Sequence, residues 1–214
     1  MTATAHLYWN SQWQAADASS PWATAEPWVL DHARSLAPNS RILDLGAGIG
    51  RHALAFAAMG HQVTALDAAE AAIAAIEAAA QGVTTTLAPM TDLPYGDGAF
   101  DHVLSWNVIY HGDETVVRRC LMEIARVTRT GGTFMATMLS ARRLPVERAK
   151  AAGREISRNT WTFDGPGDKV HPHYFCNAAD LIALMPEFEM LTLFDRVHEK
   201  PGSWHWHLLA EKMA

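Results

Sequence analysis

Short apolar runs and amphipathic stretches alternate along the middle of the chain. Runs with the length and composition of buried strands cover Arg41–Leu45, Gln62–Leu66, Val83–Leu87, Asp101–Ser105 and Thr133–Leu139. Helical spacing with helix-ending glycines covers Gly50–Met59, Ala68–Ala80 and Glu114–Thr128, the last ended by Gly131-Gly132. This alternation predicts a parallel, doubly wound sheet with helices on both faces, and ligands at the carboxyl ends of its strands.

The alternation stops after Ser140. The stretch Arg142–Phe175 is polar and has few periodic apolar positions, so we interpret it as an insertion over the ligand edge. A short helix is predicted over Ala178–Met185. The late apolar runs Met190–Val197 and Trp204–Ala210 predict an antiparallel hairpin. The expected fold is therefore α/β and Rossmann-like: a mostly parallel, seven-stranded sheet with an antiparallel C-terminal hairpin.

The first forty residues contain a predicted helix, at about Ala23–Leu36, and a tryptophan-bearing segment before it. We divide the expected single domain into an N-terminal lid and helix (1–40), a core (41–139), a substrate-covering insertion (140–176), and a C-terminal helix with hairpin (177–214). The first and third parts are the two segments able to cover a substrate.

Composition limits the partners and the cellular location that we expect. The chain has 214 residues, a formal net charge of −6, and two cysteines outside any CxxC pair. The acidic balance argues against a nucleic-acid partner. No apolar run has the length of a membrane span, and the start lacks the pattern of a secretory signal, so a cytoplasmic location is expected. The oligomeric state stays open.

The segment Asp44–Gly50 is the strongest local motif. Its G-x-G-x-G spacing lets a strand turn tightly into a helix whose N-terminus can face a ligand. Arg51 stands where the dinucleotide-binding fingerprint requires a third glycine, which disfavours a nicotinamide cofactor. Asp67 ends the next strand, where a carboxylate can accept hydrogen bonds from both hydroxyls of a ribose. Asp67 can also serve as the N-cap of the following helix.

Three stretches carry a resemblance to a known family. RILDLGAGIGRHALAFAAMGHQVTALD resembles the first half of class I S-adenosylmethionine-dependent methyltransferases. MTDLPYGDGAFDHVLS resembles their adenine-side loop and fourth strand, and EIARVTRTGGTFMATMLS their fourth helix and fifth strand. The resemblance covers roughly residues 40–140 in order, together with the late hairpin. One departure is Pro89, where many members carry an acidic residue.

The resemblance implies S-adenosylmethionine as cofactor and methyl transfer to a nucleophilic atom of a small molecule. It places the glycine loop along the methionine part, Asp67 on the ribose and Thr91–Leu93 beside the adenine. The expected cofactor-binding residues are Asp44, Gly46, Ala47, Gly48, Gly50, Arg51, Asp67, Ala68, Thr91, Asp92, Leu93, Ser105 and Asn107. An alternative is a regulatory protein that binds S-adenosylmethionine or S-adenosylhomocysteine without transfer.

The segment after the fourth strand, which the fold brings beside the methyl group, holds two candidate catalytic residues. His111 suits a general base near neutral pH, and Tyr110 an orienting hydroxyl. The alternative is that Tyr110 packs and His111 caps the turn at Gly112. Candidate substrate-binding residues are Trp9, Trp13, Trp22, His173 and His205, with the tryptophans as an apolar lid.

The histidines at 171, 173, 205 and 207 raise the question of a metal. No cysteine joins them, and we find no carboxylate spaced as a partner, so the sequence predicts no metal site. Aromatic packing under the insertion is the alternative role for this group. Arg142 and Arg143 follow the fifth strand and are either ligands for an anionic substrate or solvated.

Overall fold

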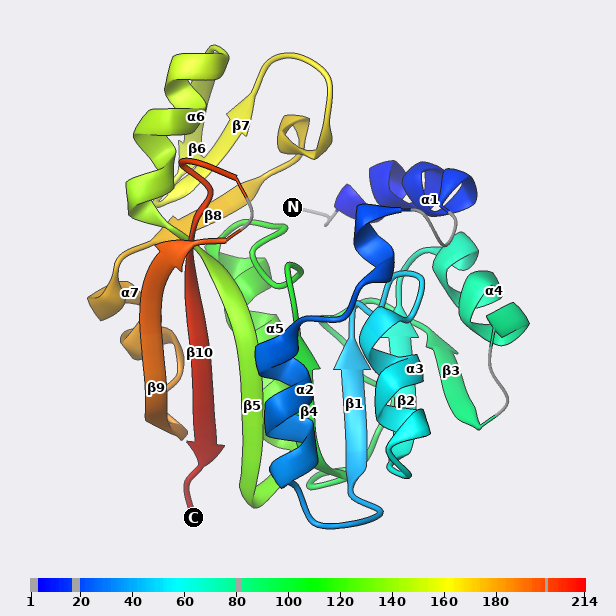
Figure 1. Ribbon diagram of the computed structural model, residues 1–214. Helices are drawn as coiled ribbons and strands as arrows, with labels where there is room; N and C mark the ends of the chain where they lie inside the picture. Colours follow the sequence, from blue (N-terminus) through cyan, green and yellow to red (C-terminus); the bar gives the residue numbers. More distant parts are fainter. Residues whose placement is uncertain (1–3, 17–19, 80–81, 199) are drawn as a thin grey trace.

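A computed structural model describes residues 4–16, 20–79, 82–198 and 200–214 (Figure 1). Its centre is one sheet in which β3, β2, β1, β4 and β5 lie side by side in that order. The sheet divides at β5, which pairs with β10 along most of its length and with β8 at its end; β9 follows β10, and β7 and β6 follow β8. The first five strands are β1 (Arg41–Leu45), β2 (Gln62–Asp67), β3 (Val83–Leu87), β4 (Phe100–Ser105) and β5 (Thr128–Ser140). They pair in parallel, as the alternation predicted.

The C-terminal hairpin is also confirmed. Strand β9 (Phe188–Val197) pairs antiparallel with β10 (Trp204–Lys212), and β10 pairs antiparallel with β5. The expected strand count was wrong, because the described residues form ten strands rather than seven. The three additional strands are β6 (Gly153–Ser157), β7 (Thr160–Phe163) and β8 (His173–Cys176), all within the stretch interpreted as an insertion.

Helices cover both faces of the sheet (Figure 1). On one face lie α2 (Pro27–Ser35), α3 (Arg51–Ala58) and α4 (Glu70–Ala79), whose apolar residues pack with Ile42 and Leu104 of the strands. On the other face lie α5 (Glu114–Val127) and α7 (Ala178–Leu184), packed against Leu43 and Phe134.

The predicted end of α4 at position 80 falls outside the described residues. Helix α5 ends at Val127, and Gly131-Gly132 lie inside β5, so the glycines do not end that helix.

The insertion is an ordered lobe at the carboxyl edge of the sheet. It begins with η2 (Ala141–Arg143) and α6 (Leu144–Lys150), continues through β6 and β7, and returns by η3 (Asp168–Val170) and β8. Strand β5 is long enough to pair with β10 along Thr133–Leu139 and, at its end, in parallel with β8. The lobe is therefore an extension of the sheet and not an irregular loop.

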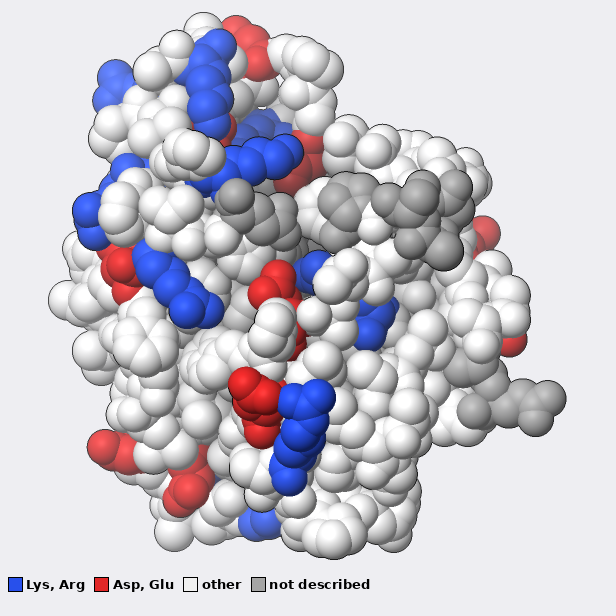
Figure 2. All heavy atoms as spheres, viewed as in Figure 1, with Lys and Arg blue, Asp and Glu red and all other residues white. Residues whose placement is uncertain are grey.

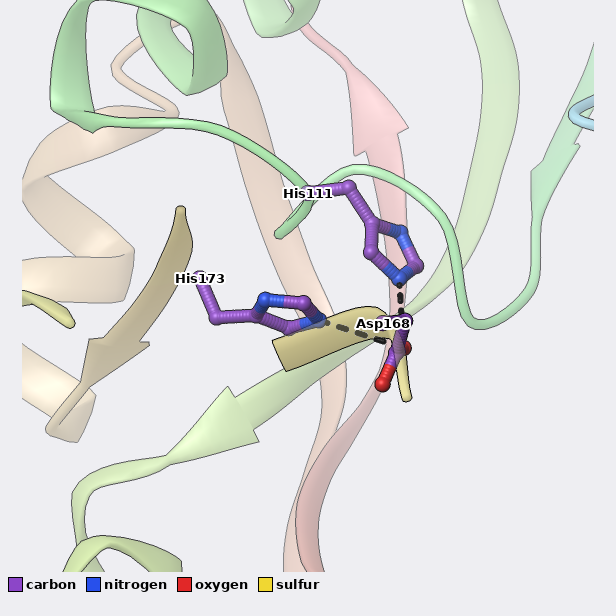
Figure 3. A group of neighbouring side chains, drawn as sticks. All are labelled: His111, Asp168 and His173. Atoms are coloured by element: carbon purple, nitrogen blue, oxygen red, sulfur yellow. Dashed lines mark hydrogen bonds and ion pairs between the residues drawn. The ribbon is translucent and has the colours of Figure 1, made fainter. Parts of the chain in front are cut away.

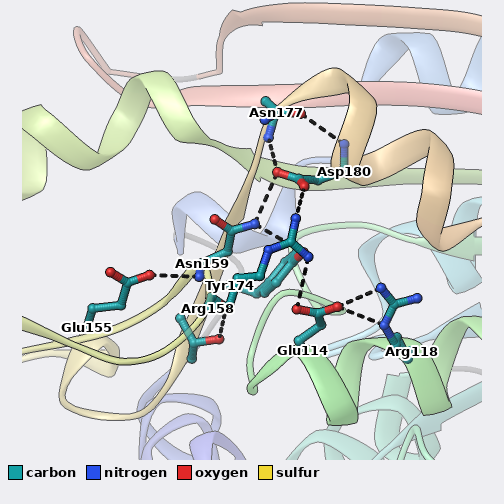
Figure 4. Close-up of polar contacts among 9 residues, drawn as sticks. Glu114, Arg118, Glu155, Arg158, Asn159, Tyr174, Asn177 and Asp180 are labelled. Atoms are coloured by element: carbon teal, nitrogen blue, oxygen red, sulfur yellow. Dashed lines mark hydrogen bonds and ion pairs between the residues drawn. The ribbon is translucent and has the colours of Figure 1, made fainter.

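A polar network fastens the β6–β7 turn to the core (Figure 4). The Arg158 guanidinium lies 2.6 Å from an Asp180 oxygen of α7 and 3.5 Å from a Glu114 oxygen at the start of α5. The Asn159 amide donates to the same Asp180 carboxylate at 3.1 Å. Asn177 and Asp180 also form the capping box of α7. The base of the lobe is thus held by charge-assisted contacts on two helices.

The N-terminal segment is more helical than expected. Helix α1 (Ala5–Ala15) and the short η1 (Pro21–Ala23) precede α2, which begins at Pro27 and not near Ala23. Helix α1 lies across the carboxyl ends of the strands, on the same side as the β6–β8 lobe (Figure 1). Among the described residues, no helix has both the length and the apolar character needed to cross a membrane. Cys120 and Cys176 are buried free thiols.

Candidate functional site

The loop between β1 and α3 depends on its glycines. Gly46, Gly48 and Gly50 have φ angles of +75°, +55° and +85°, a region that favours residues without a Cβ. A Cβ on Gly46 would lie 2.4 Å from a methyl carbon of Val108. The amides of Gly46 and Ala47 both donate to the carbonyl of Leu66, which ties the loop to β2. Backbone geometry and close packing therefore both require this motif.

Two buried carboxylates support the loop. Asp44 accepts a hydrogen bond from the Ala53 amide of α3 at 3.0 Å, and its burial raises its pKa to about 7. Asp67 accepts from the Gly48 amide and from the Ala69 amide, each at 2.9 Å. Burial also raises the pKa of Asp67. Asp67 thus binds the glycine loop and the start of the next helical segment, while each of its oxygens keeps further capacity to accept.

A cavity of about 550 Å³ opens beside these groups. Gly46, Asp67, Ala68 and Thr91 line it, as does the stretch 87–90, which the sequence analysis did not assign to the site. Asp92 is exposed, and Leu93 is buried with its amide donating to a Glu123 oxygen; neither side chain lines the cavity. The residues of this stretch that line the cavity therefore begin four positions before the expected Thr91–Leu93, of which Thr91 borders it.

The loop after β4 is held in an unusual backbone conformation. Asn107 has a φ of +66°, its amide donates to Thr137 Oγ1 at 2.8 Å, and that hydroxyl donates back to the Asn107 side-chain oxygen at 2.9 Å. Asn107 consequently lines three adjoining cavities. Ser105 is fully buried, donates to the Leu45 carbonyl and borders none of these three.

The tryptophans of the N-terminal segment cover the loop. The rings of Trp9 and Trp13 stack with centroids 5.2 Å apart, and Trp22 meets both at right angles. A Cβ on Gly48 would lie 2.9 Å from the Trp13 ring. With the glycine loop and Arg51, the three rings enclose a small space of about 60 Å³. Trp28 of α2 does not join these rings and packs on Trp106 and Phe194.

A second cavity, of about 240 Å³, lies under the lobe. Tyr110, His173 and His205 line it, as do three basic residues, Arg143, Lys169 and Lys200. Figure 2 shows basic and acidic side chains together in the hollow between the lobe and the N-terminal segment. Among the described residues lining this cavity, Asp168 is the one acidic group. The cavity is therefore predominantly basic.

Neutral histidines form one wall of this second cavity. Burial lowers the pKa of His205 to about 2 and that of His198 to about 4. The Arg143 guanidinium lies 3.0 Å from His205 Nε2, so that nitrogen accepts a hydrogen bond. Arg143 also pairs with Glu147 at 2.7 Å, whereas Arg142 pairs with Asp195 and stacks on the Trp204 ring. Of these two arginines, Arg143 lines the cavity and Arg142 does not.

His111 and His173 meet at Asp168 (Figure 3). Nε2 of each histidine lies 3.3 Å from the same Asp168 oxygen. Burial lowers the pKa of His173 to about 4, and although burial alone would raise the pKa of Asp168, the two histidines hold it well below its usual range. No carboxylate was expected as a partner for the histidines at 171, 173, 205 and 207, and that expectation was wrong for His173, which Asp168 contacts. Asp168 reaches His111 across 57 positions through the β6–β8 lobe, a relation that sequence spacing does not reveal.

Comparison with known proteins gives this arrangement a context. Residues 42–132 match the family model described as a methyltransferase domain. The chain is 35% identical over 128 residues to a demethylmenaquinone methyltransferase of Clavibacter sepedonicus, covering 56% of this chain and 51% of that protein. It is 37% identical over 138 residues to a sarcosine/dimethylglycine N-methyltransferase of Halorhodospira halochloris, covering 61% and 48%. The chain therefore spans about half the length of these relatives.

Solved structures share the fold at lower identity. A Burkholderia thailandensis 1,6-didemethyltoxoflavin-N1-methyltransferase, crystallised with 1,6-didemethyltoxoflavin and S-adenosylhomocysteine, aligns with a TM-score of 0.74 and 19% identity. The alignment covers 99% of this chain and 88% of that one. A Pyrococcus horikoshii OT3 protein aligns with the same TM-score at 15% identity, covering 94% and 98%. The β6–β8 lobe and N-terminal segment are thus included in the structural match.

Proposed function

Because the chain belongs to the class I S-adenosylmethionine-dependent methyltransferases, we propose that it transfers a methyl group from S-adenosylmethionine to a nucleophilic atom of a small molecule. The observation that carries this proposal is the meeting of two cavities. The larger one is bordered by the glycine loop and Asp67, the smaller by Tyr110 and His173, and both are lined by Trp9 and Asn107. A cofactor with its adenosine by Asp67 and its methionine part by Gly46 would present its sulfur at this shared boundary.

The residues of the larger cavity fit such a cofactor. Asp44 lines the adjoining small space of about 60 Å³ and is a buried carboxylate beside the loop, suited to an ammonium group. The two Asp67 oxygens retain lone pairs for ribose hydroxyls. Trp9 Nε1, among the described residues, is a buried donor without a hydrogen-bond partner, and its ring lines both cavities. A ligand that accepts from this indole would remove an unfavourable buried donor.

Methyl transfer requires few reactive groups from the protein itself. S-adenosylmethionine supplies a methyl carbon on a positively charged sulfur, which leaves as a neutral thioether when the acceptor's electron pair bonds to that carbon. The chain contributes mainly by holding the acceptor in line and excluding water. Trp9, Trp13 and Trp22 exclude water from the boundary, and the Asn107–Thr137 pair fixes the loop against which an acceptor would lie.

The smaller cavity favours an acceptor that carries negative charge. Arg143, Lys169 and Lys200 outnumber Asp168 on its walls. Its volume of about 240 Å³ suits a metabolite and not a polymer. Tyr110 lines it and remains our candidate for orienting the acceptor. His111 borders the larger cavity with both ring nitrogens engaged, so we assign its influence on the acceptor to Asp168 and not to direct proton removal.

Calorimetry and a transfer assay test the proposal. The chain should bind S-adenosylhomocysteine and show no binding of nicotinamide dinucleotides. With S-adenosylmethionine and a panel of anionic small molecules, release of S-adenosylhomocysteine should follow for at least one class of phenolate, thiolate or carboxylate. Binding of nicotinamide in place of S-adenosylhomocysteine would overturn the proposal. Tight binding without transfer to any acceptor would support a regulatory protein instead.

A further inference from the structure

His111, Asp168 and His173 converge from two separate parts of the chain. His111 follows β4, Asp168 begins η3, and His173 begins β8 (Figure 3). One ligand atom from each residue can be chosen so that all three lie within 4.8 Å of one another. His111 borders the larger cavity, whereas Asp168 and His173 border the smaller one. The group therefore stands between the two cavities.

The orientation of each imidazole is fixed by a backbone carbonyl. His111 Nδ1 lies 2.7 Å from the Val108 carbonyl oxygen, and His173 Nδ1 lies 2.9 Å from that of His171. A carbonyl oxygen only accepts, so Nδ1 of each ring carries the hydrogen. Nε2 of each ring is then the atom turned toward Asp168. Histidine ligands of metals show this same pattern, in which the second nitrogen donates to a carbonyl or carboxylate.

Three atoms able to bind a metal thus face one another in a protected place. Nε2 of each histidine lies 3.3 Å from the same carboxylate oxygen, and the histidines are 7% and 1% exposed. A positive charge held among these atoms, either a shared proton or a metal ion, would stabilise the buried group. Lys169 lies 3.6 Å from the other Asp168 oxygen, so this lysine does not fill the space between the histidines.

We propose that His111, Asp168 and His173 bind one first-row divalent transition metal ion, such as Zn²⁺, Fe²⁺ or Co²⁺. Two imidazoles and one carboxylate occupy one side of such an ion and leave coordination positions open. Mg²⁺ and Ca²⁺ prefer sites built from oxygen and fit this set poorly. Because the group borders both cavities, the open positions could take an oxygen, nitrogen or sulfur of an anion bound there.

The role of this ion toward an acceptor rests on the proposed methyltransferase function, but its binding does not. A metal-bound hydroxyl or thiol of the acceptor loses its proton more readily, which would present an anion at the cavity boundary. Arg143 and Lys200, which line the smaller cavity, would hold the remaining negative charge of that acceptor. The two proposals therefore make separate predictions for metal binding and for S-adenosylhomocysteine binding.

The test uses the full chain without a histidine tag, stripped with a chelator and titrated with Co²⁺ alone. We expect one equivalent of Co²⁺ to bind with a visible absorption band, Zn²⁺ to displace it, and Mg²⁺ and Ca²⁺ to leave it unchanged. Asp168→Asn and His173→Gln should weaken binding by about a hundredfold or more, as loss of a partner supporting a ligand can already do. His205→Gln, a buried histidine of the same cavity outside the group, should keep the wild-type affinity.

Each variant is first checked by circular dichroism. Asp168→Asn is expected to fold, because its amide can donate to the histidine nitrogens that the carboxylate now faces. Failure of the wild-type chain to bind Co²⁺ or Zn²⁺ would overturn the metal proposal, and so would unchanged binding by the folded Asp168→Asn variant. Calorimetry of S-adenosylhomocysteine with the stripped chain, on the same samples, tests the methyltransferase proposal separately.

Discussion

The hydroxyl of Thr4 lies 2.8 Å from Nδ1 of His171, although 167 positions separate the two residues. This contact joins the N-terminal segment to the β6–β8 lobe above the two cavities. In the same segment, the ring centroid of Trp9 lies 6.0 Å from that of His111 in the loop after β4. We therefore expect a cover made from the N-terminal segment and the lobe to part at this point when a ligand enters.

The cover is expected to open through α1. Thr4→Val removes the hydroxyl at nearly constant volume, and the loss of about 1 kcal/mol from one hydrogen bond should speed hydrogen exchange in Ala5–Ala15 by about fivefold. Ser11→Ala is the control, because the Ser11 hydroxyl bonds only within the same helix, to the Tyr8 carbonyl. S-adenosylhomocysteine should slow exchange in α1 and in Arg142–Phe175. Equal exchange in the two variants, or no ligand effect, would contradict a moving cover.

Gly48 and Gly60 provide a matched pair for the glycine loop. Both have positive φ angles, +55° and +86°, so alanine at either position should lower the free energy of unfolding by about 1–2 kcal/mol. A Cβ at Gly48 meets Trp13, whereas nothing lies within 4 Å of one at Gly60. We therefore expect Gly48→Ala to weaken S-adenosylhomocysteine binding and Gly60→Ala to leave it unchanged. Calorimetry together with denaturant unfolding separates the two effects, and equal affinities would place the site elsewhere.

Local patterns predicted the fold where each element follows from its own sequence. The run Arg41–Leu45 has apolar residues at positions 42, 43 and 45 because β1 is buried on both faces, and the alternation of such runs with helices predicts the sheet. The glycine loop and Asp67 were recognisable for the same reason: the turn and the strand end that bear them are encoded within about thirty residues.

Elements stabilised by distant contacts were missed. The strand Gly153–Ser157 is largely exposed, so it shows no alternation that would predict it. Helix α1 has no side-chain cap at Thr4 and only Ala5 buried, so its sequence lacks both a start signal and an apolar stripe. Asp168 was not predicted as a partner of His111 because the two residues are far apart in the sequence and are brought together only by the fold of the β6–β8 lobe. The residues of the smaller cavity were likewise only partly predicted.

Asp101 should be a main source of acid sensitivity. It accepts hydrogen bonds from the amide and guanidinium of Arg41 and from Arg129, and the Arg41 side-chain bond is the largest cause that lowers its pKa. A carboxyl whose pKa falls on folding stabilises the protein above its unfolded pKa, near 3.8, and loses that contribution as pH falls below it. Asp101→Asn should lower the free energy of unfolding at pH 7 by about 2 kcal/mol.

The exposed pair Asp31–Arg34 is the control for that variant. Both side chains are more than half exposed, so Asp31→Asn should change the free energy of unfolding very little. Urea unfolding at pH 7 and at pH 3 measures both variants. The difference between wild type and Asp101→Asn should shrink at the lower pH; a difference that persists there would show that the asparagine acts through packing and not through lost charge.

Asp44 should couple cofactor binding to proton release. Burial raises its pKa from 3.8 to about 7, against the opposing influence of Arg51, so the free protein binds a proton that the unfolded chain releases near pH 4. This group therefore lowers the stability of the free protein as pH rises from about 4 to 7. An ammonium group of S-adenosylhomocysteine against Asp44 would favour the ionised carboxylate. Affinity should then rise about tenfold per pH unit below 7 and level off above it.

Calorimetry in buffers of different ionisation enthalpy measures the proton that leaves. At pH 6 we expect wild type to release up to one proton on binding S-adenosylhomocysteine, and Asp44→Asn to release fewer and to bind more weakly at pH 8. Asp67 also has a pKa raised by burial, so Asp67→Asn serves as the comparison and should keep the part of the release that belongs to Asp44. If Asp44→Asn bound with wild-type affinity and the same proton release, the ammonium group would not lie against Asp44, and the orientation proposed for the cofactor would be wrong.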